Sequence, residues 1–438
     1  MRGLAVFVAL IMSFTALAVV SQPTPAQLTP QEEKQAFPWP MFHHDAGFTG
    51  FTESPAPNTA NPLWNYTLTA GVMCASPAVV DDRLFIQSED NIVYCLNATS
   101  GAFLWKHLSE GTIGYTEGQY HPNRASPAVA DGRVFVGSID DFMYSLNATT
   151  GEVLWRYKTG DDLYSFIAVA EGKVFTGSAD FNIYCFDGKT GDLIWKHNTD
   201  DWPFNPAVAY GKVFAGSQDK FFALDANTGE VVWTYTASSV ISDSPAVADG
   251  KVFFANGGSP QGWVPSQIHC LDADSGRIIW SADAPPAVFS SPAMAYGKVF
   301  VGSWDKNVYC LSPTDGAVVW SYPTRGPVAS SPAIADGKLY IGSNDGFIYC
   351  LNATGGTGLW NYKIGTEVKS SPAIADGKLY IVSREGTVFC FGTSSDQPSG
   401  PLFSPSSFEV YMLIAVAIVT TIFVCAYLFV VVRKRKST

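Results

Sequence analysis

The chain has 438 residues, of which 47% are hydrophobic and 14% aromatic, and its 27 basic and 39 acidic side chains give a formal net charge of −12. This length and apolar content suit a large folded domain and exclude a disordered chain. The acidic excess is opposite in sign to the surface that binds phosphate backbones, so we expect no nucleic-acid partner.

The first 21 residues have the pattern of a secretory signal peptide. Arg2 is followed by an apolar stretch over residues 4–20, and Val19 and Ser21 suit cleavage before Gln22. We therefore predict that residues 1–21 direct the chain to export.

Residues 22–60 form a leader segment before the repeats, and we expect Trp39 and Phe42 to pack against the domain that follows. His43 and His44 are adjacent. Because neighbouring side chains of an extended segment point in opposite directions, we predict no metal site at this pair.

One pattern recurs through residues 61–392 with a period of about 40 residues. Most copies contain Thr-Gly-x-x-x-Trp, and a second fixed segment, seen at 126–138 and again at 331–343, begins Ser-Pro-Ala. Such a period indicates a repeat architecture. The recurring tryptophans, which we expect to dock one unit on the next, are Trp64, Trp105, Trp155, Trp195, Trp233, Trp280, Trp320 and Trp360.

Each unit divides into four short strands separated by Asp-Gly, Gly-Ser-x-Asp and Thr-Gly turns, which is typical of a blade of an all-β propeller. Eight Ser-Pro-Ala-like starts predict eight blades of four antiparallel strands. The last unit ends near Phe391 without a tryptophan strand. We predict that the segment around Trp64 pairs with residues 388–391, supplies the missing outer strand and closes the ring.

Cysteines occupy the same place in the third strand of six units, where the other two units have Ser145 and Ala223. Equivalent positions of neighbouring blades are too far apart for a disulfide, so we interpret these cysteines as small buried core residues. Cys74 and Cys425 lie outside this repeated position, and the sequence shows no obvious disulfide partner for either of them. The six repeated cysteines are Cys95, Cys185, Cys270, Cys310, Cys350 and Cys390.

The C-terminal part has the pattern of a single-pass membrane anchor. A Ser/Pro-rich linker at 393–410 precedes 22 uncharged residues at 411–432, which are long enough to cross a bilayer, and a basic tail at 433–438 follows. A buried core helix is the alternative, but a propeller has no place for one. We expect a cell-membrane protein with the propeller outside and the C-terminus in the cytoplasm. The exported part then carries a charge of roughly −17.

Segments 224–233 and 271–280, which read Leu-Asp-Ala-Asn-Thr-Gly-Glu-Val-Val-Trp and Leu-Asp-Ala-Asp-Ser-Gly-Arg-Ile-Ile-Trp, resemble the tryptophan-docking repeat of the PQQ-repeat (quinoprotein-like) propellers. The resemblance covers about three quarters of the chain. That family includes quinone-dependent alcohol dehydrogenases and non-catalytic members similar to BamB, a scaffold of bacterial outer-membrane assembly.

The dehydrogenase branch implies features that this chain does not have. The sequence has no Cys-Cys pair, no Cys-x-x-Cys-His haem motif and no run of spaced aspartates resembling a calcium loop. The resemblance therefore favours the non-catalytic, BamB-like branch, without a cofactor. A lipid anchor like that of BamB is not available, because no cysteine follows the signal region.

Two insertions break the repeat, at 107–124 and 257–267, and propeller topology puts both on one face. Tryptophans outside the repeat pattern map to the same face, where they either bind a ligand or pack beneath the inserted loops. Polar residues just before innermost strands are candidates for lining the central opening. The candidate ligand-binding residues are Trp202, Trp263, Trp304, Arg124, Tyr164, Asp243 and Lys369.

Four Asn-x-Thr sequons are acceptors for N-glycosylation in an exported chain. Three of them share the Leu-Asn-Ala-Thr turn, where other units have Asp225 or Asp272, so the asparagine is alternatively present only to form the turn. The sequon asparagines are Asn65, Asn97, Asn147 and Asn352.

Two hypotheses of function follow from these patterns. The one we favour is a membrane-anchored, extracytoplasmic and non-catalytic scaffold of the cell envelope that binds a protein or glycan. The alternative is a quinone- or metal-dependent oxidoreductase with its cofactor in the central opening and Asp243 or Asp305 as the acid-base group.

Overall fold

The computed structural model describes residues 36–109, 115–116, 119–120, 125–241, 243–257, 266–283 and 288–393. All of these except Ala36 belong to one compact unit. The signal peptide, the linker after Thr393, the membrane segment 411–432 and the tail lie outside the described residues. Among the residues that are described, no helix has the length and apolar character needed to span a membrane.

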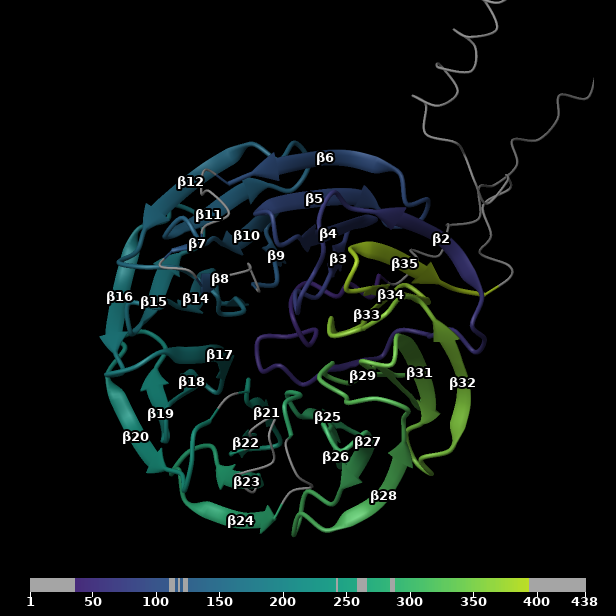
Figure 1. Cartoon of the computed structure of the whole chain (residues 1–438). Helices are drawn as coiled ribbons and strands as arrows, with labels where there is room; N and C mark the ends of the chain where they lie inside the picture. The colour runs from purple at the N-terminus through teal and green to yellow at the C-terminus, as the bar shows by residue number, and fades with distance from the viewer. Residues whose placement is uncertain are drawn as a thin grey trace, which may run out of the picture. The chain divides into compact units, whose positions relative to one another are not determined.

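The described residues form eight blades of four antiparallel strands each, which confirms the predicted eight-bladed propeller. Consecutive blades are in contact through their innermost strands, and the eighth contacts the first, so the blades form a ring (Figure 1). Blades are numbered in chain order of these innermost strands, and strands are given below from the inner to the outer one.

Blades 1 to 4 are β3 (Ala78–Val80), β4 (Arg83–Gln87), β5 (Ile92–Asn97) and β6 (Phe103–Leu108); β9 (Ala128–Ala130), β10 (Arg133–Gly137), β11 (Phe142–Asn147) and β12 (Val153–Lys158); β13 (Ala168–Ala170), β14 (Lys173–Gly177), β15 (Asn182–Asp187) and β16 (Leu193–Asn198); and β17 (Pro203–Ala209), β18 (Lys212–Ser217), β19 (Lys220–Asp225) and β20 (Val231–Thr236).

Blades 5 to 8 are β21 (Ala246–Ala248), β22 (Lys251–Asn256), β23 (Gln267–Asp272) and β24 (Ile278–Asp283); β25 (Ala293–Ala295), β26 (Lys298–Gly302), β27 (Asn307–Leu311) and β28 (Val318–Pro323); β29 (Ala333–Ala335), β30 (Lys338–Gly342), β31 (Phe347–Asn352) and β32 (Gly358–Lys363); and β33 (Ala373–Ala375), β34 (Lys378–Val382), β35 (Thr387–Phe391) and β2 (Pro62–Thr67). The first insertion contains a hairpin of β7 (Tyr115–Thr116) and β8 (Gln119–Tyr120).

The ring closes as predicted from the sequence. β2 pairs antiparallel with β35, and Trp64 lies opposite Cys390 in that ladder. The eighth blade therefore combines strands from opposite ends of the repeat region, which leaves no unpaired sheet edge where the ring begins and ends.

The repeated tryptophans join each blade to the next. In seven of them the indole N–H donates to a backbone carbonyl of the following blade, over 2.9–3.2 Å, as Trp195 does to Ala226. The ring of Trp195 also covers Gly229 of the Thr-Gly turn so closely that an added Cβ would lie 2.6 Å from the ring. Trp360 differs, because its Nε1 is buried without a partner among the described residues. In blade 8 the corresponding turn is replaced by two separate chain segments.

The repeated cysteines pair with these tryptophans across neighbouring strands. Cys95 lies opposite Trp105 and Cys185 opposite Trp195, for example, and Ser145 and Ala223 occupy the same register. Of the seven described cysteines, all but Cys74 are buried. Small side chains at this position leave room for the indole ring, as the sequence indicated.

The described part of the leader, from residue 36 on, runs through the centre of the ring (Figure 1). Six of its carbonyls accept hydrogen bonds, over 2.6–2.8 Å, from the central backbone N–H of the Ala-Val-Ala-like motif in blades 1, 2, 4, 5, 6 and 7. β1 (Phe51–Thr52) pairs parallel with β29. In blade 3 the Phe166 ring packs at a tilt against Phe42, with centroids 4.0 Å apart, and in blade 8 the Asp376 carboxylate accepts a hydrogen bond from the Phe37 amide. The leader thus contacts every blade.

Trp39 and Phe42 are buried, as the sequence led us to expect. His43 is also buried, stacks on Phe42 at 4.2 Å, and its Nδ1 lies 3.2 Å from the Phe48 carbonyl oxygen. Burial lowers the pKa of His43 to about 4. The imidazole is therefore neutral at pH 7, and protonating it opposes docking of the leader.

Two glycine substitutions test the docking contact. Gly229 and Gly211 both have a positive φ, 73° and 68°, but only Gly229 faces a tryptophan ring, whereas a Cβ at Gly211 meets nothing within 4 Å. Alanine at either position costs about 1 kcal/mol of backbone strain. We expect Gly229→Ala to lose a further ~1–3 kcal/mol because it displaces Trp195. Urea unfolding followed by tryptophan fluorescence measures both, and equal losses would show that the ring contact contributes nothing.

A second prediction concerns pH. The unfolded chain has a His43 pKa near 6.5 and the folded chain about 4, so stability is complete above pH 6.5 and falls as the pH drops towards 4. The loss amounts to about 3 kcal/mol. His43 has a positive φ of 52°, which asparagine tolerates, and the asparagine amide can still donate to the Phe48 carbonyl. We therefore expect His43→Asn to show a smaller loss of urea stability between pH 6.5 and 4.5. Parallel curves for the two proteins would contradict this assignment.

Candidate ligand-binding site

A central cavity of about 520 Å³ opens among the loops that lead into the innermost strands and the loops between second and third strands. We call this side of the propeller the cavity face. Blades 1 and 3 to 8 contribute lining residues, and Phe42 of the leader is one of them. The cavity has the volume of a typical small-ligand site (about 300–1,000 Å³).

Aromatic side chains make up a third of the residues that line the cavity. Trp202, before β17, is 51% exposed, so a large apolar surface faces solvent at the cavity. Trp304, between β26 and β27, packs against Phe289 with ring centroids 5.1 Å apart. The other aromatic lining residues are Phe42, Tyr164, Phe166 and Phe204.

The described lining residues include one acidic and one basic side chain. Asp243, before β21 in blade 5, is only 8% exposed. Lys369, before β33 in blade 8, has its Nζ 2.8 Å from Oε2 of Glu367. Two blades separate these charges, so they lie at different sides of the cavity.

Three serines of the Ser-Pro-Ala motif, Ser291, Ser331 and Ser371, are among the residues that line the cavity. The Ser331 amide donates to the Ser371 hydroxyl, and the Ser371 amide donates to Ser76 across the ring closure, both over 3.0 Å. In the same way the Ser291 amide donates a hydrogen bond to the Ser331 hydroxyl, and the Phe166 amide donates one to the side-chain oxygen of Asn205. Each hydroxyl that accepts here keeps its own proton for donation. Aromatic walls and hydroxyl donors suit an amphipathic ligand.

Five of the seven candidate residues lie in this cavity, namely Trp202, Trp304, Tyr164, Asp243 and Lys369. Trp263 and Arg124 lie outside the described residues. The structure therefore brings most of the predicted set together, while its role in ligand binding stays a prediction.

Sequence reasoning missed Phe289 and Cys74, which also line the cavity. Both occupy the repeat position of Tyr164 and Lys369, two residues before the serine of the Ser-Pro-Ala motif or its equivalent. Comparing that one position across all repeats would have found them. Phe204 had no such signal, because it belongs to β17, the longest inner strand described.

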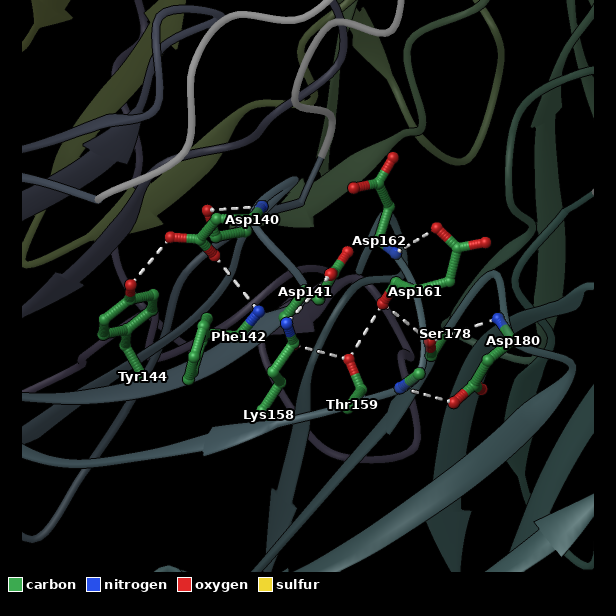
Figure 2. Close-up of polar contacts among 12 residues, drawn as sticks. Asp140, Asp141, Phe142, Tyr144, Lys158, Thr159, Asp161, Asp162, Ser178 and Asp180 are labelled. Carbon is green, nitrogen blue, oxygen red and sulfur yellow. Dashed lines mark hydrogen bonds and ion pairs between the residues drawn. The ribbon is translucent and has the colours of Figure 1, made fainter. Parts of the chain in front are cut away.

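An aspartate cluster lies on the cavity face between blades 2 and 3 (Figure 2). Asp141, Asp161 and Asp162 have carboxylate oxygens within 4.8 Å of one another. The Lys158 ammonium lies 3.7 Å from Asp141. Desolvation raises the pKa of Asp141, and Lys158 opposes that shift. Exposed carboxylates with a lysine counter-charge are common on surfaces, so this cluster alone does not define a metal site.

The neighbouring Asp140 shows what the repeated turn aspartates do (Figure 2). It accepts from the Phe142 amide and, over 2.7 Å, from the Tyr144 hydroxyl. Asp305, the second acid-base candidate of the oxidoreductase hypothesis, makes the same pair of bonds to Asn307 and Tyr309. The bond to Asp305 helps to raise the pKa of Tyr309, after desolvation. Asp305 therefore has a turn-forming role and does not line the cavity.

Three sequon asparagines have the alternative turn role. Asn147 Oδ1 accepts from the amides of Thr149 and Thr150, just as Asp225 accepts from the amides of Asn227 and Thr228. Asn97 and Asn352 form the same turn. Asn65 is exposed on β2. Glycosylation at all four positions stays a prediction.

A quinone bound together with a calcium ion, which is one form of the quinone- or metal-dependent oxidoreductase hypothesis, does not fit the described lining residues. Calcium takes six to eight oxygen ligands, usually including several carboxylates. The described part of the cavity wall offers one carboxylate, Asp243. The cavity is better suited to contact through aromatic surfaces and hydroxyl groups.

A family model described as outer membrane protein assembly factor BamB matches residues 55–119, 114–205, 179–264 and 260–399, which together span most of the chain. The chain belongs to the PQQ-repeat propeller family. This confirms the resemblance seen in the sequence and accounts for the repeated tryptophan contacts. No curated protein matches this family member significantly.

Solved structures share the fold at low identity. BamB from Moraxella catarrhalis is 19% identical, with a TM-score of 0.61, over 76% of this chain and 97% of BamB. A europium-containing methanol dehydrogenase is 15% identical, with a TM-score of 0.67, over 82% and 89% of the two chains. The computationally designed Ika8 protein is 17% identical, with a TM-score of 0.65, over 76% of this chain and all of Ika8. These similarities establish the fold and are compatible with both scaffold and enzyme.

Thiol labelling tests the cavity. Burial raises the pKa of Cys95, Cys185, Cys270, Cys310 and Cys350 to about 12, so at pH 8 these thiols are protonated as well as inaccessible. Cys74 is partly exposed and lines the cavity. In a Cys425→Ser background we expect an aromatic disulfide reagent to label one thiol rapidly, and Cys74→Ser to abolish that phase. Rapid labelling of several thiols would contradict the packing described.

Proposed function

We propose that this protein is a membrane-anchored, non-catalytic recognition propeller of the cell envelope that binds a protein or glycan partner at the cavity face. The proposal has residues 411–432 crossing the membrane, the propeller outside and residues 433–438 in the cytoplasm. The uncharged 22-residue stretch and the basic tail that follows it support this topology.

The observation that carries the proposal is the aromatic surface of the central cavity. Trp202 is half exposed and lies beside the partly buried Tyr164, Phe166 and Phe204 in the same lining. Rigid aromatic side chains bury much area at low entropic cost, so they are common anchors of protein and sugar ligands. The hydroxyl and amide groups of the serine positions supply the polar contacts that orient a ligand.

The family supports a binding role without deciding it. The matching family model is that of BamB, an outer membrane protein assembly factor, whereas several similar structures are alcohol or methanol dehydrogenases. We favour binding because Asp305 is engaged in its turn and the described cavity wall holds only one carboxylate.

Site-specific photocrosslinking tests the proposal. A photoreactive amino acid replaces Trp202 in the full-length chain in its native membranes, and a matched control replaces Val232, which is 47% exposed on the outer strand β20. We expect a discrete adduct, identified by mass spectrometry, from position 202 and none from position 232. The adduct should be lost on adding Trp304→Ala and Tyr164→Ala, which remove aromatic lining around the site.

The same preparation tests the oxidoreductase alternative. If the purified wild-type chain carries a stoichiometric quinone and reduces an artificial electron acceptor, and position 202 gives no adduct, the binding proposal is wrong. Equal adducts from positions 202 and 232 would also contradict the binding proposal, because the partner would then bind the cavity face no better than the outer strand β20.

A further inference from the structure

Three of the turns that join a third strand to a fourth contain a glycosylation sequon. They begin at Asn97, Asn147 and Asn352, in blades 1, 2 and 7. The loops between second and third strands lie on the cavity face, so the antiparallel strands place these turns at the opposite end of the propeller. If the asparagines were present only to form the turn, the equivalent turns of the other blades should have the same composition.

Aspartate forms the same turn in blades 3 to 5. Oδ1 of Asp187, for example, accepts from the amides of Lys189 and Thr190, two and three residues further along the chain. The second residue after the aspartate is lysine, asparagine or aspartate in these blades, whereas it is threonine after each of the three asparagines. The turn of blade 6 has Ser312 before Thr314 and is not a sequon. The turn therefore tolerates several residues at this position and does not explain why asparagine and threonine occur together.

The turn uses the backbone of the sequon threonine but not its hydroxyl. The Thr149 amide donates to Asn147, while the Thr149 hydroxyl has no hydrogen bond among the described residues. Thr354 has the same arrangement after Asn352. Thr150, by contrast, uses its hydroxyl oxygen to accept from a backbone amide of the turn. Both sequon threonines are exposed, so their hydroxyls are accessible to a modifying enzyme.

Two of the asparagine side chains are bonded through oxygen and leave nitrogen available. Nδ2 of Asn147 and Nδ2 of Asn352 make no hydrogen bond within the described part of the chain, and both residues are partly exposed. Asn97 differs, because its Nδ2 donates to the Asp82 carboxylate over 2.6 Å. N-glycosylation substitutes Nδ2 and leaves Oδ1 as an acceptor. Asn147 and Asn352 can therefore form the turn and carry a glycan at the same time.

The middle residue of each of these two sequons anchors the turn to the preceding blade. The Ala148 carbonyl accepts from the Trp105 indole, and the Ala353 carbonyl accepts from the Trp320 indole. Both alanines are buried, whereas the threonines that follow them are exposed. A glycan on the partly exposed asparagine therefore does not need to displace the docking tryptophan.

We propose that Asn147 and Asn352 are glycosylated on Nδ2, at the end of blades 2 and 7 that lies away from the cavity face. The donor is a lipid-linked glycosyl phosphate, used by a membrane glycosyltransferase. The bond between Nδ2 and C1 of the sugar forms, the bond between C1 and the phosphate oxygen breaks, the lipid phosphate leaves with the electron pair, and Nδ2 loses one proton. This inference rests on the extracytoplasmic placement in the proposed function, and it leaves the cavity face uncovered for a partner.

Mass spectrometry of the full-length chain from its native membranes tests the modification. We expect the proteolytic fragments that contain Asn147 and Asn352 to carry a glycan. Thr149→Val should remove the glycan from Asn147, because it removes the sequon hydroxyl, whereas the matched control Thr150→Val should retain it. Asn147→Asp should also be unmodified, with the turn formed as it is at Asp225. Unmodified asparagines at both positions, or a glycan that persists in Thr149→Val, would overturn the proposal.

A transplanted sequon tests whether the threonine selects the site. Asp187→Asn combined with Lys189→Thr creates Asn-Gly-Thr in the turn of blade 3 and keeps the acceptor of its two amide bonds. We expect the double variant to gain a glycan at position 187 and Asp187→Asn alone to gain none. A glycan on the single variant would contradict the sequon argument, because no threonine then lies two residues after the asparagine.

Labelling of intact cells with a membrane-impermeant amine reagent separates this inference from the proposed function. Lys189 is exposed in the turn of blade 3 and reports on the side of the membrane that holds the propeller. If Lys189 is labelled while Asn147 and Asn352 are unmodified, the glycosylation is wrong and the placement outside the membrane stands. If Lys189 is protected and both asparagines are unmodified, the placement is wrong as well.

Discussion

The contact between a tryptophan of one blade and a glycine turn of the next holds the ring together. A single four-stranded blade cannot bury both of its faces, so its stability depends on neighbours on either side. Trp195 illustrates the contact, since its ring covers Gly229 and its N–H reaches the Ala226 carbonyl. Only glycine fits beneath the ring, and the small residue opposite each tryptophan lets the indole lie flat.

The innermost strand of each blade has an edge that faces the central channel. The leader pairs with the backbone amides of these edges. Six backbone carbonyls within residues 39–50 accept hydrogen bonds from the equivalent backbone amides of six blades. Unpaired edge amides in a narrow channel are costly, so the leader stabilises the ring while filling one side of its centre. The central cavity therefore does not pass freely through the ring, because the leader residue Phe42 is one of its lining residues.

The repeat keeps the positions that hold blades together and varies those that face the cavity. Two residues before the Ser-Pro-Ala motif or its equivalent, the chain has Cys74, Tyr164, Phe289 and Lys369 at the same repeat position. These side chains point to the cavity rather than to a neighbouring blade, so changing them does not disturb docking. Their aromatic and charged character is therefore a property of the site.

The sequence by itself determined the number of blades, the closing strand and the buried cysteines, because each depends on a local pattern repeated eight times. The Trp64 strand beside Cys390 followed from counting alone. Five candidate side chains were assigned to one face by repeat position, and they line one cavity.

Only the tertiary structure decided the path of the leader, the pairing of Asp305 with Tyr309 and the place of Phe204 in the cavity. The leader bonds through backbone carbonyls, which leave no side-chain signature, and it contacts blades more than 300 residues away along the chain. The contacts that form the site depend on how the ring brings distant loops together around its centre, and a repeat pattern contains no information about that geometry.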